Sequence, residues 1–213
     1  MRFSLIHPSM GRPEQALACF NTWRGFGSDV GIQHIVSLSA NDPTIDTYTS
    51  LFTTDDSAVI VSPATNMVAA SNIAAERADG DVLILISDDM FPPIGWANKI
   101  TPYLDVEWPV VLQVHDGIRD DIMTLPIMNR AAYDQLGYLY HPDYLSMFAD
   151  NDLAETAKAQ GWYVKCEVRF EHRHYTVGKA ELDDTYRKEN SRVKWDHGQR
   201  VYERRKRDGF TIR

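Results

Sequence analysis

The stretch GDVLILISDDM, residues 80–90, decides the fold of this chain. Its uninterrupted apolar run, residues 82–86, indicates a β-strand buried on both faces, which is typical of a parallel sheet covered by helices. Asp88 and Asp89 follow at the carboxyl end of that strand, the edge at which open α/β sheets bind ligands. Two adjacent carboxylates repel each other, and a hard divalent cation with oxygen ligands relieves that repulsion. The sequence therefore predicts a metal-dependent site at this edge.

Strand and helix patterns alternate on both sides of this stretch. Before it we expect strands over 3–7, 32–38 and 58–61 and helices over 13–23 and 66–78. After it we expect, in order, a helix over 92–103, a strand over 109–114, a loop and strand over 118–128, helices over 129–137 and 147–160, a strand over 162–170 and a polar helical segment over 183–207. This alternation predicts an α/β fold with a Rossmann-like, mostly parallel central sheet flanked by helices and a C-terminal helical tail.

The composition is that of one globular domain. The chain has 213 residues, of which 44% are hydrophobic and 24% charged, enough for a single well-buried core. We find neither a secretory signal nor an apolar window of membrane-spanning length, so we expect a cytoplasmic protein without a membrane span. Cys19 and Cys166 lie far apart, and we expect structural thiols rather than a disulfide framework.

Charge is distributed unevenly along the chain. Residues 1–187 carry 13 Lys and Arg against 26 Asp and Glu, whereas residues 188–213 carry 9 against 4. The acidic body does not suit a broad polyanion surface, but the run RRKR, residues 204–207, suits a local phosphate contact. The alternative is a solvated terminal helix whose cations lie against the acidic body, and we favour it.

Three further segments carry residue types that suit a nucleotide site. In IHPSMGRPE, residues 6–14, Pro8 ends a predicted strand and Arg12 is free to reach a ribose or phosphate oxygen. In NIAAERADGD, residues 72–81, small residues allow a helix to pack closely on the sheet. The third, FADNDL over residues 148–153, places two carboxylates at the start of a predicted helix.

In this order and at this spacing, the four segments resemble the inverting nucleotide-sugar glycosyltransferases of the GT-A fold, especially the large family 2. The resemblance extends over about residues 3–175. It implies one GT-A catalytic domain over 1–182, with a nucleotide-sugar-binding half over 1–104 and an acceptor-binding half over 105–182. A basic helical tail over 183–213 follows.

The resemblance also implies roles for single residues. Those expected to bind the nucleotide sugar are Pro8, Arg12, Asp42, Asn72 and Asp88. Asp89 is expected to ligate Mn²⁺ or Mg²⁺ that bridges the diphosphate, because the leaving nucleoside diphosphate gains negative charge in the transition state. Ser87 stands where the family has its first Asp, and this departure makes metal dependence a point to test.

The catalytic base and the remaining metal ligand are expected in the second half. Asp150 matches the base that takes a proton from the acceptor hydroxyl, although Ala149 stands where the family has Glu. After the last predicted strand, either His172 or His174 is expected to complete the metal shell with a neutral imidazole. Alternation places both on the same face, and the sequence does not choose between them.

The function expected from this resemblance is a metal-dependent inverting transfer of a hexosyl or pentosyl group from a nucleotide-diphosphate sugar to an acceptor hydroxyl. The acceptor is open between a saccharide, including a lipid-linked one, and a hydroxymethylated DNA base. Two alternatives come from other classes, a nucleotidyltransferase and a non-catalytic sugar-nucleotide binding protein. The donor sugar, the nucleotide and the oligomeric state stay open.

Overall fold

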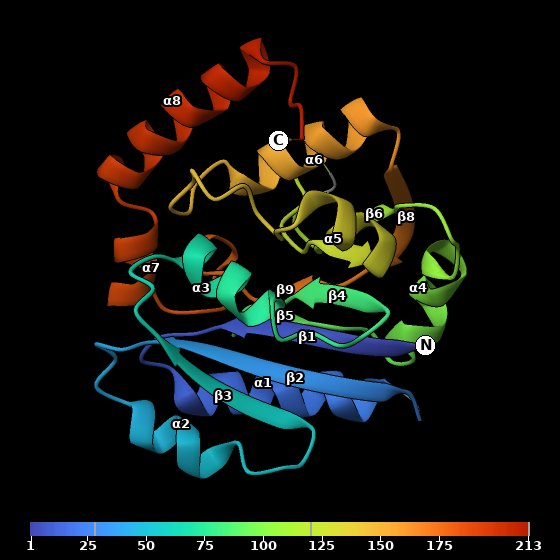
Figure 1. Cartoon of the computed structure of the whole chain (residues 1–213). Coiled ribbons are helices and arrows are strands. Elements are labelled where there is room, and N and C mark those ends of the chain that lie inside the picture. Colours follow the sequence, from blue (N-terminus) through green and yellow to red (C-terminus); the bar gives the residue numbers. More distant parts are fainter. Residues whose placement is uncertain (28, 120, 213) are drawn as a thin grey trace.

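The computed structural model describes residues 1–27, 29–119 and 121–212 (Figure 1). Within these residues a central sheet has seven strands in the order β3-β2-β1-β4-β7-β6-β8. Their bounds are β1 (Arg2–Pro8), β2 (Gly31–Ser39), β3 (Ser57–Ser62), β4 (Val82–Leu85), β6 (Val111–His115), β7 (Ile127–Asn129) and β8 (Tyr163–Arg169). Neighbouring strands are parallel except at β7, which runs antiparallel to β4 and β6. The mostly parallel α/β fold predicted from the sequence is confirmed.

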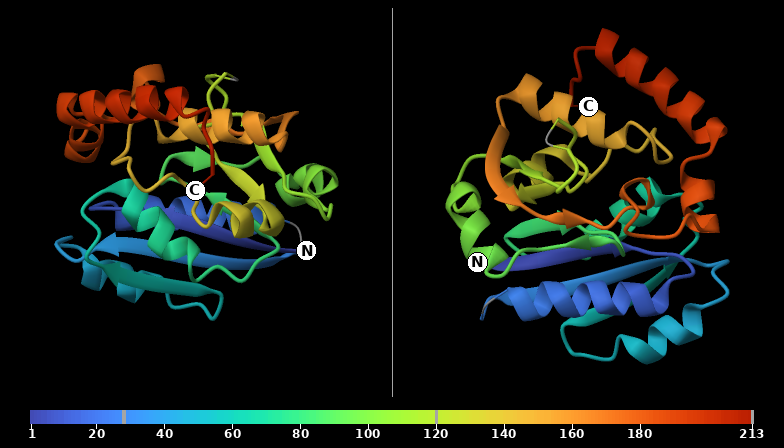
Figure 2. Two further views of the ribbon diagram at one scale, coloured as in Figure 1. Left: turned by 45° about the horizontal axis from the view of Figure 1, so that its top comes forward. Right: turned by 180° about the vertical axis from the view of Figure 1, so that it is seen from behind.

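Helices cover both faces of the sheet (Figure 2). One hydrophobic cluster joins the sheet to α1 (Pro13–Phe26), α2 (Ile45–Leu51) and α4 (Trp96–Leu104). A second cluster joins the opposite face to α3 (Met67–Ala75), α5 (Arg130–Leu136) and α6 (Ala149–Gln160). The chain ends with α7 (Asp184–Glu189) and α8 (Arg192–Arg207). This three-layer arrangement leaves the carboxyl ends of the parallel strands uncovered by these flanking helices.

The strand predicted to be buried on both faces is β4. Val82 and Ile84 belong to the first cluster, Leu83 and Leu85 to the second, and none of the four is more than 6% exposed. Gly80 precedes the strand where a Cβ atom would lie 2.7 Å from the backbone nitrogen of Ser4. The close approach of the chain to β1 therefore requires glycine at this position.

Some elements differ from the expectations. Helix α2 was not predicted, because Thr and Ile are weak helix formers and the helix buries only Tyr48 among its seven residues. A second, two-stranded sheet pairs β5 (Met90–Phe91) with β9 (Glu171–His172), and a short 3₁₀ turn η1 (Tyr175–Val177) follows it. The polar segment 183–207 is two helices rather than one, separated at Asn190 and Ser191.

The tail packs against the body through α8. Arg205 is 3% exposed and pairs with Asp152 of α6, from Nε to Oδ2 at 3.0 Å. Gly198 of α8 faces the carbonyl of Met147, so closely that no Cβ atom fits between them. Arg204 pairs with Asp143 in the loop before α6. Two cations of the run 204–207 therefore lie against acidic groups of the body, as the favoured interpretation expected.

Among the described residues, no helix is both long and apolar enough to cross a membrane. Cys19 and Cys166 are buried free thiols, as expected.

Candidate functional site

The turn after β4, residues 86–89, is held by α1. Cys19 Sγ donates to the carbonyl of Ser87 at 3.1 Å, and Trp23 Nε1 donates to the carbonyl of Met90 at 2.8 Å. Both α1 side chains are fully buried. The backbone that carries the two adjacent carboxylates is thus fixed from the α1 side of the sheet.

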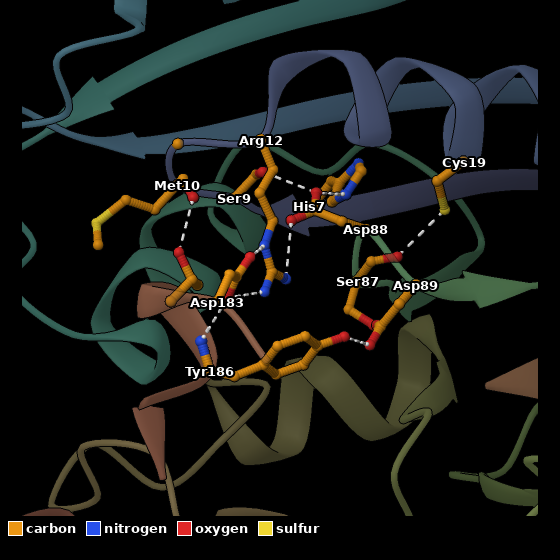
Figure 3. Close-up of polar contacts among 12 residues, drawn as sticks. His7, Ser9, Met10, Arg12, Cys19, Ser87, Asp88, Asp89, Asp183 and Tyr186 are labelled. Carbon is orange, nitrogen blue, oxygen red and sulfur yellow. Dashed lines mark hydrogen bonds and ion pairs between the residues drawn. The ribbon is translucent and has the colours of Figure 1, made fainter. Parts of the chain in front are cut away.

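Asp88 belongs to a buried hydrogen-bond network (Figure 3). Its Oδ1 accepts from His7 Nε2 at 2.9 Å and from Ser9 Oγ at 2.7 Å. His7 Nδ1 lies 3.0 Å from His34 Nε2, and Ser9 Oγ lies 2.5 Å from the Tyr48 hydroxyl. Burial and the neighbouring His7 lower the pKa of His34 well below its ordinary value, so His34 is neutral and has one N–H. Its Nε2 faces His7 Nδ1, and His7 Nε2 faces Asp88, so the two rings support the carboxylate and orient it.

Asp89 is engaged on both of its carboxylate oxygens. Ser87 Oγ donates to Oδ1 at 2.6 Å, and the Tyr186 hydroxyl donates to Oδ2 at 2.6 Å. His172 Nε2 lies 3.3 Å from the same Oδ2. Burial alone would raise the pKa of Asp89, but the hydrogen bond and charge of His172, with the bonds from Ser87 and Tyr186, hold it well below its ordinary range. Asp89 is therefore an anion at neutral pH.

His172 lies between two carboxylates. The pairing of β5 with β9 places it opposite Met90, next to the end of β4. Its Nδ1 lies 3.5 Å from Asp116 Oδ2, and its Nε2 faces Asp89. Burial would lower the pKa of His172, but Asp116 and Asp89 together raise it to about 9. A proton and a metal ion therefore compete for Nε2.

The donor set fits a divalent metal in part. A carboxylate oxygen of Asp89 and a ring nitrogen of His172, 3.3 Å apart, are ligand types that Mn²⁺ accepts. Asp116 behind the ring is the arrangement that orients a ligating histidine. His174 lies beside this pair, with its ring centroid 4.9 Å from that of His172 and its Nδ1 2.8 Å from Thr176 Oγ1. Within the described residues no group of three or more His, Cys, Asp or Glu side chains is arranged as a metal site, so further ligands would have to come from a bound molecule.

A C-terminal segment that we call the strap, Asp183–Asn190, crosses the site. Arg12 forms a two-pronged pair with Asp183, from Nε at 2.7 Å and from Nη2 at 2.6 Å. The Arg12 guanidinium also lies 4.2 Å from the centre of the Tyr186 ring and 3.8 Å from Asp88 Oδ2. Arg12 thus joins the strap to the sheet.

The strap has further contacts with the site. Thr185 Oγ1 donates to the Met10 carbonyl at 3.2 Å, in the loop after β1. The Tyr186 hydroxyl is the donor on Asp89, and burial and that carboxylate raise the pKa of Tyr186, so the phenol keeps its proton. In this conformation the Tyr186 hydroxyl takes up one acceptor position of Asp89 Oδ2, an oxygen that a metal ion would also use.

A cavity of about 330 Å³ opens between the strap and the sheet. The carboxyl ends of β1, β2 and β4, the start of α3 and the strap form its walls. Of the predicted site residues it is lined by Pro8, Arg12, Asp88, Asp89, His172 and His174. Its size is that of a pocket for a small molecule.

Comparisons with solved structures identify the fold. The Pyrobaculum calidifontis mannosyltransferase PcManGT, in complex with GDP-Man and Mn²⁺, superposes with a TM-score of 0.62 at 14% identity over 80% of this chain. A 1–349 fragment of S. aureus TarS in complex with UDP gives 0.60 at 13% identity over 96% of this chain. Glucosyl-3-phosphoglycerate synthase from Mycobacterium tuberculosis, with Mn²⁺, UDP and phosphoglyceric acid, gives 0.59 at 13% over 81%. The chain has the GT-A fold.

Each match covers most of this chain but a smaller share of the GT-A protein to which it is compared. This chain spans 56% of the mannosyltransferase, 72% of the TarS fragment and 71% of the synthase, and 44% of the TarS chain in another structure. No family model matches the chain, and no curated protein matches its sequence. The similarity therefore concerns the GT-A architecture.

Asp150 lies in the first turn of α6, on the second half of the GT-A sheet. It is partly buried, and burial raises its pKa to about 6, although the backbone N–H of Asn151 donates to its Oδ1 at 2.9 Å. Its charge acts on Tyr140, a buried residue that lines the cavity. Among the described residues that line the cavity, Asp150 itself is not included. Its neighbour Asp152 pairs with Arg205, which is a structural role.

Asp42 and Asn72 lie behind the cavity walls. Asp42 Oδ2 accepts from the backbone N–H of Gly11 at 2.9 Å, and Oδ1 accepts from the backbone and hydroxyl of Thr44. Asn72 accepts from the backbone N–H groups of residues 139 and 140 and donates to the Tyr140 carbonyl at 2.7 Å. This geometry favours a supporting role for both, and direct nucleotide contact stays a prediction.

Several residues of the site were not predicted from the sequence. His7, Ser9 and Asp116 follow or end predicted strands, and their place at the carboxyl edge is a signal that could have found them. Asp183 and Tyr186 had no such signal, because they come from a polar helical tail that the sequence does not connect to the sheet.

Proposed function

We propose that this chain is a metal-dependent glycosyltransferase that moves a sugar from a nucleoside diphosphate donor to an acceptor hydroxyl with inversion at the anomeric carbon. The observation that carries the proposal is the meeting of Asp88, Asp89 and His172 on one rim of a 330 Å³ cavity at the carboxyl edge of a GT-A sheet. The GT-A structures bound to GDP-Man or UDP, two of them with Mn²⁺, support the same donor class.

The donor diphosphate is expected at the end of β4. Asp89 and His172 would hold Mn²⁺ or Mg²⁺, and the ion would stabilise the negative charge that develops on the leaving diphosphate. Asp88, whose Oδ1 is held by His7 and Ser9, keeps Oδ2 for a ribose hydroxyl. Arg12 is the nearest guanidinium to this carboxylate and offers donors to a phosphate oxygen once Asp183 releases it.

Asp150 is the proposed catalytic base. As the acceptor oxygen attacks the anomeric carbon, its proton passes to the Asp150 carboxylate. The bond from the anomeric carbon to the diphosphate oxygen breaks on the opposite face, and its electron pair leaves with the diphosphate. A pKa of about 6 makes Asp150 a stronger base than an ordinary aspartate while it remains ionised at pH 7.

A saccharide hydroxyl is the first acceptor class to test. The argument for a DNA base rested on a free basic tail, and that argument is weaker because Arg205 is buried against Asp152 and Arg204 pairs with Asp143. The surface cations that remain in this run are Lys206 and Arg207.

The test compares wild type, Asp150→Asn and Asp134→Asn with nucleotide-sugar donors, Mn²⁺ and a saccharide panel. Asp134 is an exposed carboxylate of α5 and serves as the matched control. We expect wild type and Asp134→Asn to release free nucleoside diphosphate, and Asp150→Asn to turn over about 10³-fold more slowly while it still binds the donor. Unchanged turnover in Asp150→Asn would remove it as the base, and release of pyrophosphate would indicate a nucleotidyltransferase.

A further inference from the structure

The cavity contains two buried polar atoms without a protein partner. Ser37, on β2, is 1% exposed, and its Oγ has no hydrogen-bond partner among the described residues. Glu189, the last residue of α7, has one carboxylate oxygen, Oε2, that is also buried and unpartnered within the same residues. Both side chains line the cavity. An unpaired buried polar group costs about 1 to 3 kcal/mol, so two such atoms in residues that line one cavity point to a ligand.

The second oxygen of Glu189 has a different partner. Its Oε1 accepts from Lys194 Nζ at 2.6 Å, at the start of α8. Lys194 is outside the cavity lining, and its side chain is 11% exposed. The ion pair therefore accounts for Oε1 and leaves Oε2 without a partner among the described residues.

The position of Ser37 indicates which part of a donor reaches these atoms. Ser37 pairs with Pro8 of β1, and β1 lies between β2 and β4, so Ser37 is two strands from the turn that carries Asp88 and Asp89. Two strand spacings amount to about 10 Å. With the diphosphate at the end of β4, the part of the donor at this distance is the nucleoside.

We propose that the strap is a wall of the nucleoside pocket and that Glu189 Oε2 binds the nucleoside, accepting a hydrogen bond from a base N–H or a ribose O–H. The Ser37 hydroxyl, which can donate or accept, contacts the nucleoside from the sheet side. A carboxylate accepts and does not donate, so Glu189 discriminates against nucleosides that present a lone pair at this point. This inference rests on the proposed function, because it takes the diphosphate position from it.

The experiment measures binding by calorimetry in the presence of Mn²⁺. The ligands are the nucleoside diphosphates of uracil, guanine, adenine, cytosine and thymine, and inorganic pyrophosphate, which has no nucleoside. The variants are Glu189→Gln, Ser37→Ala and the control Lys194→Met, which removes the same ion pair without a change in the cavity. We expect Glu189→Gln to lower the affinity for the preferred nucleotide about tenfold, and Ser37→Ala to lower it about threefold. Lys194→Met should stay within about twofold of wild type, and pyrophosphate should bind all four proteins equally.

A second measurement removes the hydrogen bond from the ligand side, so its main result is obtained on wild type. Analogues of the preferred nucleotide, in which each N–H or O–H is methylated or removed in turn, are titrated into wild type and Glu189→Gln. One analogue should bind wild type about tenfold more weakly than the unmodified nucleotide does. On Glu189→Gln the same analogue should show no further loss of affinity, because the substitution has already removed that hydrogen bond.

The outcomes separate the inference from the proposed function. Equal losses in Lys194→Met and Glu189→Gln, or no loss in Glu189→Gln and no sensitive analogue, would overturn the role of Glu189 while nucleotide binding by wild type stands. If wild type binds none of the five nucleotides, the proposed function fails, and the inference fails with it.

Discussion

The two walls of the cavity are held by different kinds of contact. The sheet wall consists of strands buried on both faces, and its Asp88 is fixed by His7 and Ser9 in a buried network. The strap buries only Tyr186 among the six residues of α7 and is attached by polar contacts through Arg12 and Asp89. Segments with few buried apolar contacts open at low free energy. The sheet wall is therefore preorganised, whereas the strap can detach from it at low free energy.

One hydrogen bond of the strap competes with a metal ion at Asp89. The Tyr186 hydroxyl donates to Asp89 Oδ2, an oxygen that a metal ion would also use. Binding of metal and donor would therefore replace this hydrogen bond, while Glu189 would stay near the nucleoside. The strap can give up this contact and still form one wall of the cavity.

The largest effect on stability is expected from breaking the sheet wall. His7→Leu removes the bonds to Asp88 and His34, so buried His34 loses this partner and Asp88 keeps only Ser9 on Oδ1, and the free energy of unfolding should fall by about 2 to 4 kcal/mol. Urea denaturation followed by circular dichroism measures it. Surface substitutions usually change the free energy of unfolding by up to about 0.5 kcal/mol. A decrease smaller than that in His7→Leu would mean that the network does not fix this wall.

A slightly smaller effect, on the order of 2 kcal/mol, is expected at Asp150 and depends on pH. Its folded-state pKa of about 6 lies above the ordinary 3.8, so its contribution to stability is present below about pH 4 and is lost as the pH rises through 6. Asp150→Asn does not titrate and should be more stable than wild type above pH 6, with the difference closing towards pH 4. Denaturation curves at several pH values test this, and a difference independent of pH would contradict the shift.

A substitution in the strap should change metal affinity more than it changes the free energy of unfolding. Tyr186→Phe keeps the ring over Arg12 and removes the hydroxyl from Asp89, so the free energy of unfolding should change by less than about 1 kcal/mol. Affinity for Mn²⁺ should rise about fivefold, because the metal no longer displaces a hydrogen bond. Paramagnetic resonance of free Mn²⁺ measures this, and Tyr103→Phe, an exposed tyrosine of α4, is the control. Weaker Mn²⁺ binding in Tyr186→Phe would show that the phenol supports the metal site instead.

The smallest effect is expected from salt. Asp183 in the Arg12 pair is 42% exposed, whereas Arg205 and Asp152 are 4% and 2% exposed. Raising the ionic strength from about 0.05 to about 0.5 M should speed amide hydrogen exchange in the strap about twofold and leave that of α6 unchanged, since exposed pairs are screened and buried ones are not. Equal responses in the two segments would remove this distinction between the walls.

The same difference explains what the sequence could predict. The continuous apolar run of β4 and the carboxylates after it set the buried strand, the mostly parallel sheet and the edge where Asp88 and Asp89 lie. Local patterns carry this information, because strand burial and strand ends are read from neighbouring residues. That either His172 or His174 would lie at the site followed from the resemblance and from their place after a predicted strand, although the short β5–β9 pairing that brings His172 to Asp89 was not predicted.

The strap could not be predicted in this way. The Arg12–Asp183 pair joins residues 171 positions apart, and the Tyr186–Asp89 bond joins residues 97 apart. In the sequence, residues 183–207 are a polar helical segment whose cations were expected to lie against the acidic body, and no pattern indicates a partner at the carboxyl edge of the sheet. Asp42 and Asn72 show the opposite case, because short polar side chains in turns and helices support the backbone as readily as they bind ligands.

The most direct test of the account is the melting temperature of wild type and Asp89→Asn with a panel of nucleotide sugars, each with and without Mn²⁺. A ligand that binds only the folded state raises the melting temperature according to its concentration relative to its dissociation constant. The account expects at least one donor to raise it by several degrees in wild type with Mn²⁺, and not without the metal or in Asp89→Asn. A donor that stabilises Asp89→Asn as much as wild type, or no stabilisation by any donor, would contradict a metal-dependent nucleotide-sugar site at the end of β4.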